Sequence, residues 1–279
     1  MHAVAIDEFM AVIAGRDGYF LINRKDVYVG RALEIYGEYN GLEAAFLKRL
    51  VMPGDVVVEV GANTGSHTVG LAKAVGAQGK VFAFEPQRAC YALLQAQIAL
   101  NRLSNVVVAY NEAVGRERGR LWVPPVNYDN PGNFGGVALG PQHSPAAQPV
   151  DVTTLDERLG DTKCSLIKID VEGMEEDVIR GGLNSIRKHR PLLYVENDRP
   201  DKSPPLVALL LELGYRLWWH LPPLFRKDNF FNVSADAYPN IVSFNMICAP
   251  EAKPVFSGLQ EISSAQQPHP LAPQPTGTR

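Results

Sequence analysis

The sequence predicts an α/β fold built on a doubly wound, mostly parallel seven-stranded sheet whose final strand is antiparallel. Short runs such as Val56–Val60 and Val81–Phe84 are apolar almost throughout, and they alternate with amphipathic segments of helical length. Strands of this kind, separated by helices, are typical of a parallel sheet covered on both faces. The last two expected strands follow one another without a clear helix between them, which favours an antiparallel final strand. The arrangement is Rossmann-like.

The elements follow from hydrophobic periodicity and from glycine and proline positions. We expect strands at 56–60, 81–85, 106–110, 165–170, 191–196, 215–220 and 241–248. We expect helices at 65–76, 87–101, 174–188 and 204–213. Thr154-Leu155-Asp156-Glu157 has the pattern of a capping box and predicts one more short helix.

The chain divides into three parts by pattern. Residues 1–50 are expected to form an N-terminal extension of short strands and a helix that packs on the core, with strands at Tyr19–Ile22 and Val27–Val29. Residues 51–250 carry the main domain, and residues 251–279 have the Pro-, Gln- and Ser-rich composition of a disordered tail.

One segment interrupts the alternation of strands and helices. Residues 119–153 are expected to form an inserted hairpin, in which Gly119–Val123 pairs with Val150–Thr153. The connection between them, residues 124–149, is rich in Pro, Gly and Asn. A loop of this length inside a compact domain is typical of a functional lid or a disordered insert, and its aromatic residues Tyr128 and Phe134 favour a lid.

Composition narrows the classes of function. The 279 residues carry a net charge of −3 without a basic stripe, so we expect no nucleic-acid partner. The three cysteines, Cys90, Cys164 and Cys248, lie far apart and indicate buried thiols in a reducing compartment. No apolar run approaches membrane-spanning length and the start has no signal-peptide pattern, so we expect a cytoplasmic protein without a membrane span.

The end of the first core strand suggests a cofactor site. Glu59 is followed by a turn that contains Gly61, Asn63 and Gly65. This turn lacks the G-x-G-x-x-G spacing with which dinucleotide-binding folds seat a pyrophosphate on a helix N-terminus. An acid before the turn suits a cationic ligand better than phosphates, and S-adenosylmethionine has a ribose, an ammonium and a sulfonium but no phosphate. We therefore expect it to be the cofactor, with Glu59 near its ammonium.

Two further strand ends complete the expected cofactor site. Glu85 ends the second strand, where an acid can bind both ribose hydroxyls of an adenosine. Asn111 and Ala113 follow the third strand, where doubly wound folds often contact the base. The amide of Asn111 could bind the adenine edge, although an asparagine that only shapes the turn explains the residue equally well.

The fourth strand delivers acids to the same edge. Asp170 and Glu172 follow Ile167–Ile169, and two carboxylates beside a sulfonium can orient an acceptor hydroxyl and take its proton. The alternative is an acidic start to the next helix, which the helix dipole favours. Lys168 in the same strand can neutralise one of these acids. Glu196, at the end of the fifth strand, is expected to support Asp170 and Glu172 in catalysis.

A metal site at this edge is a further alternative. Asp170, Glu196 and Asn197 offer only oxygen ligands from the side chains, which suit a hard divalent ion such as Mg²⁺. The other interpretation is that Glu196 orients the substrate directly, and we favour it. We therefore expect no metal.

Several segments together resemble the FkbM-type S-adenosylmethionine-dependent methyltransferases over about residues 18–250. They are residues 33–39, 54–65, 82–86, 133–136 and 167–175. The resemblance implies a class I methyltransferase fold, bound S-adenosylmethionine, and usually methylation of a hydroxyl on a sugar or natural-product scaffold. The family commonly has Asp where this chain has Glu59, which keeps the charge and changes only fine geometry.

The function expected from the sequence is O-methylation of a hydroxyl on a sugar, glycolipid or natural-product-type small molecule. The acceptor is a small molecule or is linked to a glycan or lipid, and a homo-oligomer is compatible with the sequence. The rival functions are an NAD(P)-dependent oxidoreductase, for which the pyrophosphate-binding glycine pattern is missing, and a catalytically inactive cofactor-binding scaffold, which the presence of Asp170 and Glu172 disfavours.

Overall fold

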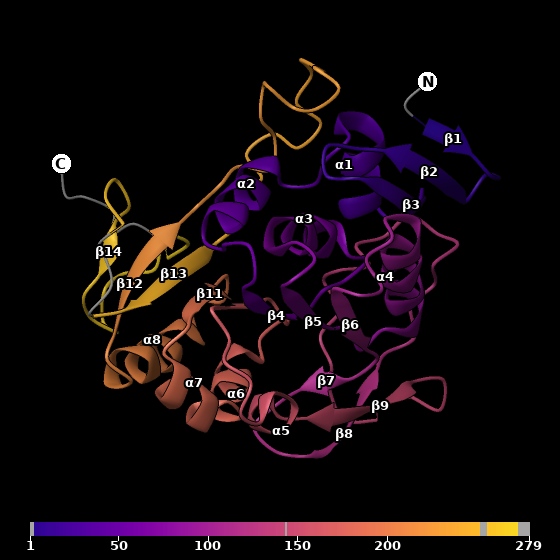
Figure 1. Cartoon of the computed structure of the whole chain (residues 1–279). Coiled ribbons are helices and arrows are strands. Elements are labelled where there is room, and N and C mark those ends of the chain that lie inside the picture. The colour runs from indigo at the N-terminus through magenta and orange to yellow at the C-terminus, as the bar shows by residue number, and fades with distance from the viewer. Residues whose placement is uncertain (1–2, 143, 252–255, 273–279) are drawn as a thin grey trace.

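The computed structural model describes residues 3–142, 144–251 and 256–272, and a central sheet runs through it (Figure 1). Its strands are β4 (Val56–Val60), β5 (Lys80–Phe84), β6 (Val107–Tyr110), β10 (Leu166–Ile169), β11 (Leu192–Glu196), β12 (Tyr215–His220), β13 (Asn245–Pro250) and β14 (Glu261–Ile262). Their spatial order is β14-β12-β13-β11-β10-β4-β5-β6. The order reverses direction at β4, which lies between β5 and β10.

The expected parallel sheet with an antiparallel final strand is present. β4 pairs in parallel with both β5 and β10, whereas β13 pairs antiparallel with β11 and β12. The sheet has eight strands rather than the expected seven, because β14 adds two residues beside Leu217 and Trp218. The strand expected at 241–248 begins only at Asn245, since residues 241–244 still belong to the preceding loop.

Helices cover both faces of this sheet. α3 (Ser66–Val75) and α4 (Arg88–Leu100) lie on one face, and α5 (Leu155–Leu159), α6 (Glu175–Arg180), α7 (Leu183–His189) and α8 (Ser203–Glu212) lie on the other (Figure 1). The capping box is present at α5, where Thr154 Oγ1 accepts a hydrogen bond from the Glu157 amide at 3.2 Å. No helix that the structure describes has the length and apolar composition to cross a membrane.

The single helix expected at 174–188 is divided into α6 and α7 by Gly181 and Gly182. A Cβ atom at Gly181 would lie 2.0 Å from the Gly115 carbonyl oxygen, and one at Gly182 would lie 2.8 Å from a Leu155 side-chain carbon. The two glycines therefore let this connection pack directly against neighbouring backbone and against α5.

The N-terminal segment contains an antiparallel sheet of β1 (Ala3–Ala5), β2 (Met10–Ala14) and β3 (Tyr19–Asn23), followed by α1 (Val29–Tyr36) and α2 (Gly41–Arg49). The strand expected at Val27–Val29 is wrong, because Val29 begins α1 and Asp26 accepts hydrogen bonds from the Tyr28 and Gly30 amides. β3 packs on α4, where the Gln97 side chain exchanges two hydrogen bonds with the backbone of Leu21.

The insert forms the expected hairpin. β8 (Gly119–Val123) pairs antiparallel with β9 (Gln148–Thr153), and β7 (Ala113–Val114) joins β9 on its other side. The connection between β8 and β9 reaches back to the carboxyl edge of the central sheet. There Phe134 is buried and its carbonyl accepts a hydrogen bond from Gln87 Nε2 at 2.8 Å.

Part of the region expected to be a disordered tail is structured. Residues 256–272 run along the β12 edge, Ile262 is buried, and His269 Nε2 lies 2.8 Å from the Asn197 carbonyl oxygen. Composition alone misses this contact because a few anchoring side chains are enough to hold a polar segment against a sheet edge. The remaining residues of the expected tail, 252–255 and 273–279, lie outside the described residues.

Candidate active site

Two adjoining pockets open at the carboxyl edge of the central sheet. Both are lined by Gly61, Glu85, Gly135, Asp170 and Glu172. Because these residues belong to both pockets, the two form one continuous cleft. Its position is the edge at which open α/β sheets bind their ligands.

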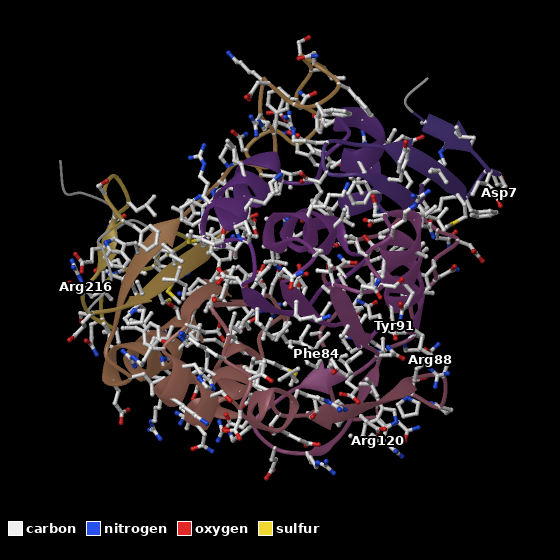
Figure 2. All side chains as sticks on the ribbon, in the orientation of Figure 1. Asp7, Phe84, Arg88, Tyr91, Arg120 and Arg216 are labelled. Carbon is white, nitrogen blue, oxygen red and sulfur yellow. The ribbon has the colours of Figure 1, made fainter. Side chains whose placement is uncertain are left out.

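The two pockets differ in chemistry. We call the first the acidic pocket, because its lining includes the side chains of Glu43, Glu59, Glu85, Asp170, Glu172, Glu196 and Asp198. We call the second the apolar pocket, because its lining includes Phe84, Pro86, Val114, Val137, Leu139 and Met174. Figure 2 shows Phe84 inside the molecule, whereas Arg120 lies at its periphery.

Gly61 brings the ends of β4 and β10 together. Its φ is +82°, and a Cβ atom at this position would lie 1.7 Å from the Asp170 carbonyl oxygen. Only glycine accommodates both the left-handed backbone and this approach. Gly65 also has a positive φ, +87°, and directly precedes α3. The glycine turn that we expected at the cofactor therefore also sets the position of Asp170.

Glu85 is buried at the junction of the two pockets. Its Oε2 accepts a hydrogen bond from the Asn63 amide and its Oε1 accepts one from the Gln87 amide, each at 2.8 Å. Burial raises the pKa of Glu85 to about 7, although these two hydrogen bonds oppose the rise. Each carboxylate oxygen keeps a second lone pair, so the oriented carboxylate can still accept from two hydroxyls.

Glu59 is buried below the glycine turn. Thr68 Oγ1 donates to Glu59 Oε2 at 2.6 Å. Burial raises the pKa of Glu59 to about 7, and the nearby Lys168 charge opposes the rise. An acid in this place is costly without a cation, because the ionised form is removed from water.

Asp170 and Lys168 form an ion pair at the end of β10. Lys168 Nζ lies 3.0 Å from Asp170 Oδ2, and the Lys168 side chain is only 2% exposed whereas that of Asp170 is 39% exposed. Burial favours a higher pKa for Asp170, but the Lys168 charge and hydrogen bond outweigh it and hold this pKa below its ordinary value. The expected neutralisation by Lys168 is confirmed, and Asp170 is an ionised carboxylate that faces the cleft.

Glu196 is the neighbour of Asp170. Burial raises the pKa of Glu196 well above its ordinary value, and the negative charge of Asp170 raises it further. The neighbouring Glu196 carboxyl also helps to keep the pKa of Asp170 low. The two acids therefore divide their roles: Glu196 holds the proton and Asp170 holds the charge.

Glu172 lies in the cleft in a left-handed conformation, with φ +57°. Its carboxylate is paired with the Arg199 guanidinium. Burial raises the pKa of Glu172 to about 7, the Asp170 charge raises it further, and Arg199 opposes the rise. The backbone conformation is rare for a residue other than glycine, and it turns the chain sharply behind Asp170.

Of the two residues expected at the base, one has other contacts and one lines a pocket. Asn111 is absent from the described lining of both pockets, and its amide nitrogen donates to the carbonyl oxygens of Glu85 and Pro86 at 2.9 and 3.0 Å. These bonds favour the alternative in which Asn111 shapes the turn after β6, and the adenine contact stays a prediction. Ala113, by contrast, lines the apolar pocket.

The alternative Mg²⁺ site does not fit this geometry. The Asn197 side chain is buried away from the cleft, where its amide nitrogen donates to Ser203 Oγ at 2.8 Å and contacts Met246 Sδ at 3.2 Å. Asp170 and Glu196 line the acidic pocket, but Asn197 does not. Among the described residues, no group of three or more His, Cys, Asp or Glu side chains is arranged to hold a metal.

The structure adds residues that the sequence did not single out. Tyr39 and Glu43 come from the N-terminal segment, and Asn245 comes from the start of β13. Asn245 Nδ2 donates to Glu43 Oε2 at 3.3 Å, although the two residues are 202 positions apart. No local pattern marks such a pairing. His67, near the start of α3, also lines the acidic pocket.

The cleft contains polar groups suited to S-adenosylmethionine. The side-chain oxygen of Asn63 is buried without a hydrogen-bond partner in the described part of the chain, and Glu85 has free lone pairs beside it. Gly135 closes over Asn63 so tightly that a Cβ atom would lie 2.7 Å from Asn63 Nδ2. The apolar pocket can take a base, the Glu85 carboxylate a ribose, and the acidic pocket a cationic amino-acid end. The residues therefore fit this cofactor.

The comparisons with known proteins identify the family. The methyltransferase FkbM domain matches residues 59–217, which is more than half of the chain. The chain belongs to the FkbM methyltransferase family. The family match contains the glycine turn, Glu85, Asp170 and Glu196. Among curated proteins, none matches the chain.

Solved structures of methyltransferases are similar to this FkbM-family protein at low identity. The methyltransferase FkbM from Methylobacillus flagellatus is 18% identical with a TM-score of 0.48; the match covers 80% of this chain and 55% of that chain. This chain thus spans about half of that relative. An S-adenosylmethionine-dependent O-methyltransferase from Thermotoga maritima is 13% identical with a TM-score of 0.47, with coverages of 88% and 79%. The O-methyltransferase TomG from Streptomyces achromogenes, solved with S-adenosylmethionine, is 10% identical with a TM-score of 0.45, with coverages of 76% and 78%.

Proposed function

We propose that this protein uses S-adenosylmethionine to methylate a hydroxyl on a sugar, glycolipid or natural-product-type small molecule. The observation that carries the proposal is that Glu85 and Asp170 line the same cleft at the carboxyl edge of the sheet. One is a buried carboxylate with lone pairs free for a diol, and the other is an ionised carboxylate held open to the cleft.

The cofactor, when bound, supplies an electrophilic methyl group on a sulfonium. Glu85 would accept from the ribose hydroxyls, with Asn63 and Gly135 beside it. The amino-acid end of the cofactor would lie beside Glu59 and the turn that Gly61 and Gly65 shape. Ala113 would contact the adenine base in the apolar pocket. The acidic lining favours a cationic ligand in this half of the cleft.

Asp170 would orient the acceptor hydroxyl and receive its proton. A bound cofactor would give its methyl group to the hydroxyl oxygen and keep the electrons of the carbon–sulfur bond, and the Asp170 carboxylate would take the O–H proton. Lys168 keeps this carboxylate ionised before the reaction. Glu172 would support Asp170 from the turn that follows it, and Glu196 would support it as a protonated neighbour. Alignment of the hydroxyl with the methyl group can contribute ~7 kcal/mol or more of the acceleration.

The NAD(P)-dependent oxidoreductase is the weaker alternative. The pyrophosphate of NAD(P) is negatively charged and would lie at the glycine turn. There it would be close to the acids Glu59, Glu85 and Asp170, which would repel it. The other alternative, an inactive cofactor-binding scaffold, would also keep the cofactor site. Its function would not require an ionised carboxylate that faces the cleft.

Calorimetric titration with S-adenosylmethionine and with NAD tests the cofactor. We expect binding of S-adenosylmethionine alone; binding of NAD alone would overturn the proposal. Asp170→Asn should keep cofactor affinity and lose most methyl transfer to an acceptor, measured with radiolabelled S-adenosylmethionine. Asp161→Asn, which changes an exposed acid outside the cleft, is the matched control. Unchanged turnover in Asp170→Asn would remove the proposed role of Asp170.

A further inference from the structure

Part of the acidic pocket lies outside the segment that matches the family. Tyr28, Tyr39 and Glu43 precede that segment, and Leu224, Ser243 and Asn245 follow it. These residues come from the N-terminal segment and from residues 221–245, which lie side by side above the sheet in Figure 1. The wall that they form is a feature of this chain beyond the family match.

Hydrogen bonds hold the two segments of this wall together. The Tyr36 hydroxyl donates to the Ala235 carbonyl at 3.0 Å and accepts from the Ala237 amide at 2.7 Å. Arg226 lies 3.7 Å from Glu38 across the same contact, and its Nη1 donates to the Gly41 carbonyl at 3.3 Å. The wall is therefore preorganised rather than assembled by a ligand.

Positive charge in the acidic pocket is already paired. Lys168 is the one permanently charged cation among the described residues of its lining, and it pairs with Asp170. Arg199, which lies behind the cleft, pairs with Glu172 and lies 3.5 Å from Asp198. No cation of the described lining remains for a phosphate or carboxylate of the acceptor. Of the described side chains, only a histidine lies within ion-pair distance of Glu43.

Glu43 and His67 present acceptor atoms without donors. Glu43 Oε2 accepts from the amides of Asn40 and Asn245, but Glu43 Oε1 has only His67 Nε2, at 3.7 Å. Burial lowers the pKa of His67 to about 3, so the ring is neutral and carries one N–H. With that hydrogen on Nε2, toward the carboxylate, Nδ1 is an acceptor.

Among the residues that the structure describes, none is a hydrogen-bond partner of His67 Nδ1. His67 is 7% exposed, lines the acidic pocket, and its Nδ1 is a buried atom without a hydrogen bond. A buried acceptor without a donor is costly, and a ligand that donates would remove the cost. The Glu43 carboxylate and His67 Nδ1 are therefore two separate acceptor positions in one pocket lining, because it is Nε2 that faces Glu43. A carboxylate suits the N–H donors of an ammonium group, and a neutral imidazole nitrogen suits a hydroxyl donor.

We propose that the acceptor carries a protonated amine, that Glu43 binds this amine in the wall of the acidic pocket, and that His67 Nδ1 accepts from a hydroxyl of the same acceptor. The inference rests on the proposed methyl transfer and adds the charge of the substrate. It also explains which group is methylated. An amine held as ammonium beside Glu43 has no free lone pair, so the nucleophile is the hydroxyl at Asp170, whose proton leaves as the carbon–oxygen bond forms.

The test measures binding of three related probes to the protein saturated with S-adenosylhomocysteine. D-glucosamine, D-glucose and D-glucose 6-phosphate differ in charge but share a ring. At pH 7 we expect D-glucosamine to bind about tenfold or more tightly than D-glucose, since a hydrogen bond to a charged group is stronger than a neutral one, and D-glucose 6-phosphate not to bind. Equal binding of the three, preference for the phosphate, or binding of none overturns the inference.

Variants separate the amine site from the cofactor site. Glu43→Gln should weaken D-glucosamine binding about tenfold and leave D-glucose and S-adenosylhomocysteine within about twofold. Glu34→Gln is the matched control, because Glu34 lies in the same segment and pairs with Arg24 away from the cleft. If S-adenosylhomocysteine binds but Glu43→Gln leaves the probe preference unchanged, only the amine inference fails. If S-adenosylhomocysteine and S-adenosylmethionine do not bind, the proposed function itself fails.

Discussion

The substitution Gly61→Ala should be far more damaging than an ordinary exchange of glycine for alanine. Two separate effects act at Gly61: its φ is +82°, and a Cβ atom there would lie 1.7 Å from the Asp170 carbonyl oxygen. Gly54 provides the matched control, since its φ is +89° but a Cβ atom would meet nothing within 4 Å. Gly61 directly follows β4, and Gly54 lies two residues before it.

The difference between the two variants isolates the steric effect. Placing alanine in a left-handed conformation costs about 1–2 kcal/mol, and Gly54→Ala should lose about that much stability. Gly61→Ala adds a clash with backbone, which can be relieved only if the ends of β4 and β10 move apart by more than an ångström. Overpacking of this kind costs about 3 kcal/mol or more beyond the backbone term.

Thermal unfolding measures both variants. A loss of 1 kcal/mol lowers the Tm of a domain of this size by about 2 °C, so we expect a decrease of about 2–4 °C for Gly54→Ala and about 8 °C or more for Gly61→Ala. Calorimetric titration should also show that Gly61→Ala loses S-adenosylmethionine binding, because Gly61 itself lines both pockets and its turn would shape the amino-acid end of the cofactor site. Equal Tm values for the two variants would refute the reasoning.

Three further predictions concern the charges of the cleft. Glu59 and Glu85 each have a pKa near 7 and should favour a cationic cofactor only when they are ionised. The affinity for S-adenosylmethionine, measured by calorimetric titration, should therefore fall about tenfold per group from pH 8 to pH 6. An affinity independent of pH would contradict this. Lys168→Met removes the cation that keeps the pKa of Asp170 low, so the acidic limb of the pH–rate profile should move to higher pH, and chemical denaturation should show a loss of about 3 kcal/mol. Thr68→Val removes the hydrogen bond to Glu59 and should lower stability by about 1.5–3 kcal/mol at pH 8, where Glu59 is ionised, but by less at pH 5; an equal loss at both pH values would show that only packing matters.

The sequence by itself determined the alternation of strands and helices and the acids at the strand ends. Apolar runs such as Val56–Val60 form buried strands because both faces of each strand are covered, and the chain must turn where a charged residue and a glycine follow. Glu85 and Asp170 could be assigned to one edge of the sheet because parallel strands end at the same edge. These are local patterns combined with one general rule of topology.

Only the tertiary structure decided which side chains enter the cleft. Asn111 and Asn197 follow core strands as expected, but their side-chain amides donate to neighbouring protein groups. The direction in which a side chain points after a strand depends on the turn that follows the strand. Glu43 enters the cleft from α2 and meets Asn245 across 202 positions, a contact that depends on how the N-terminal segment packs on the sheet. The burial that raises the pKa of Glu43 to about 7 arises from the same packing, because desolvation depends on every segment that surrounds a charge and not on its neighbours in sequence.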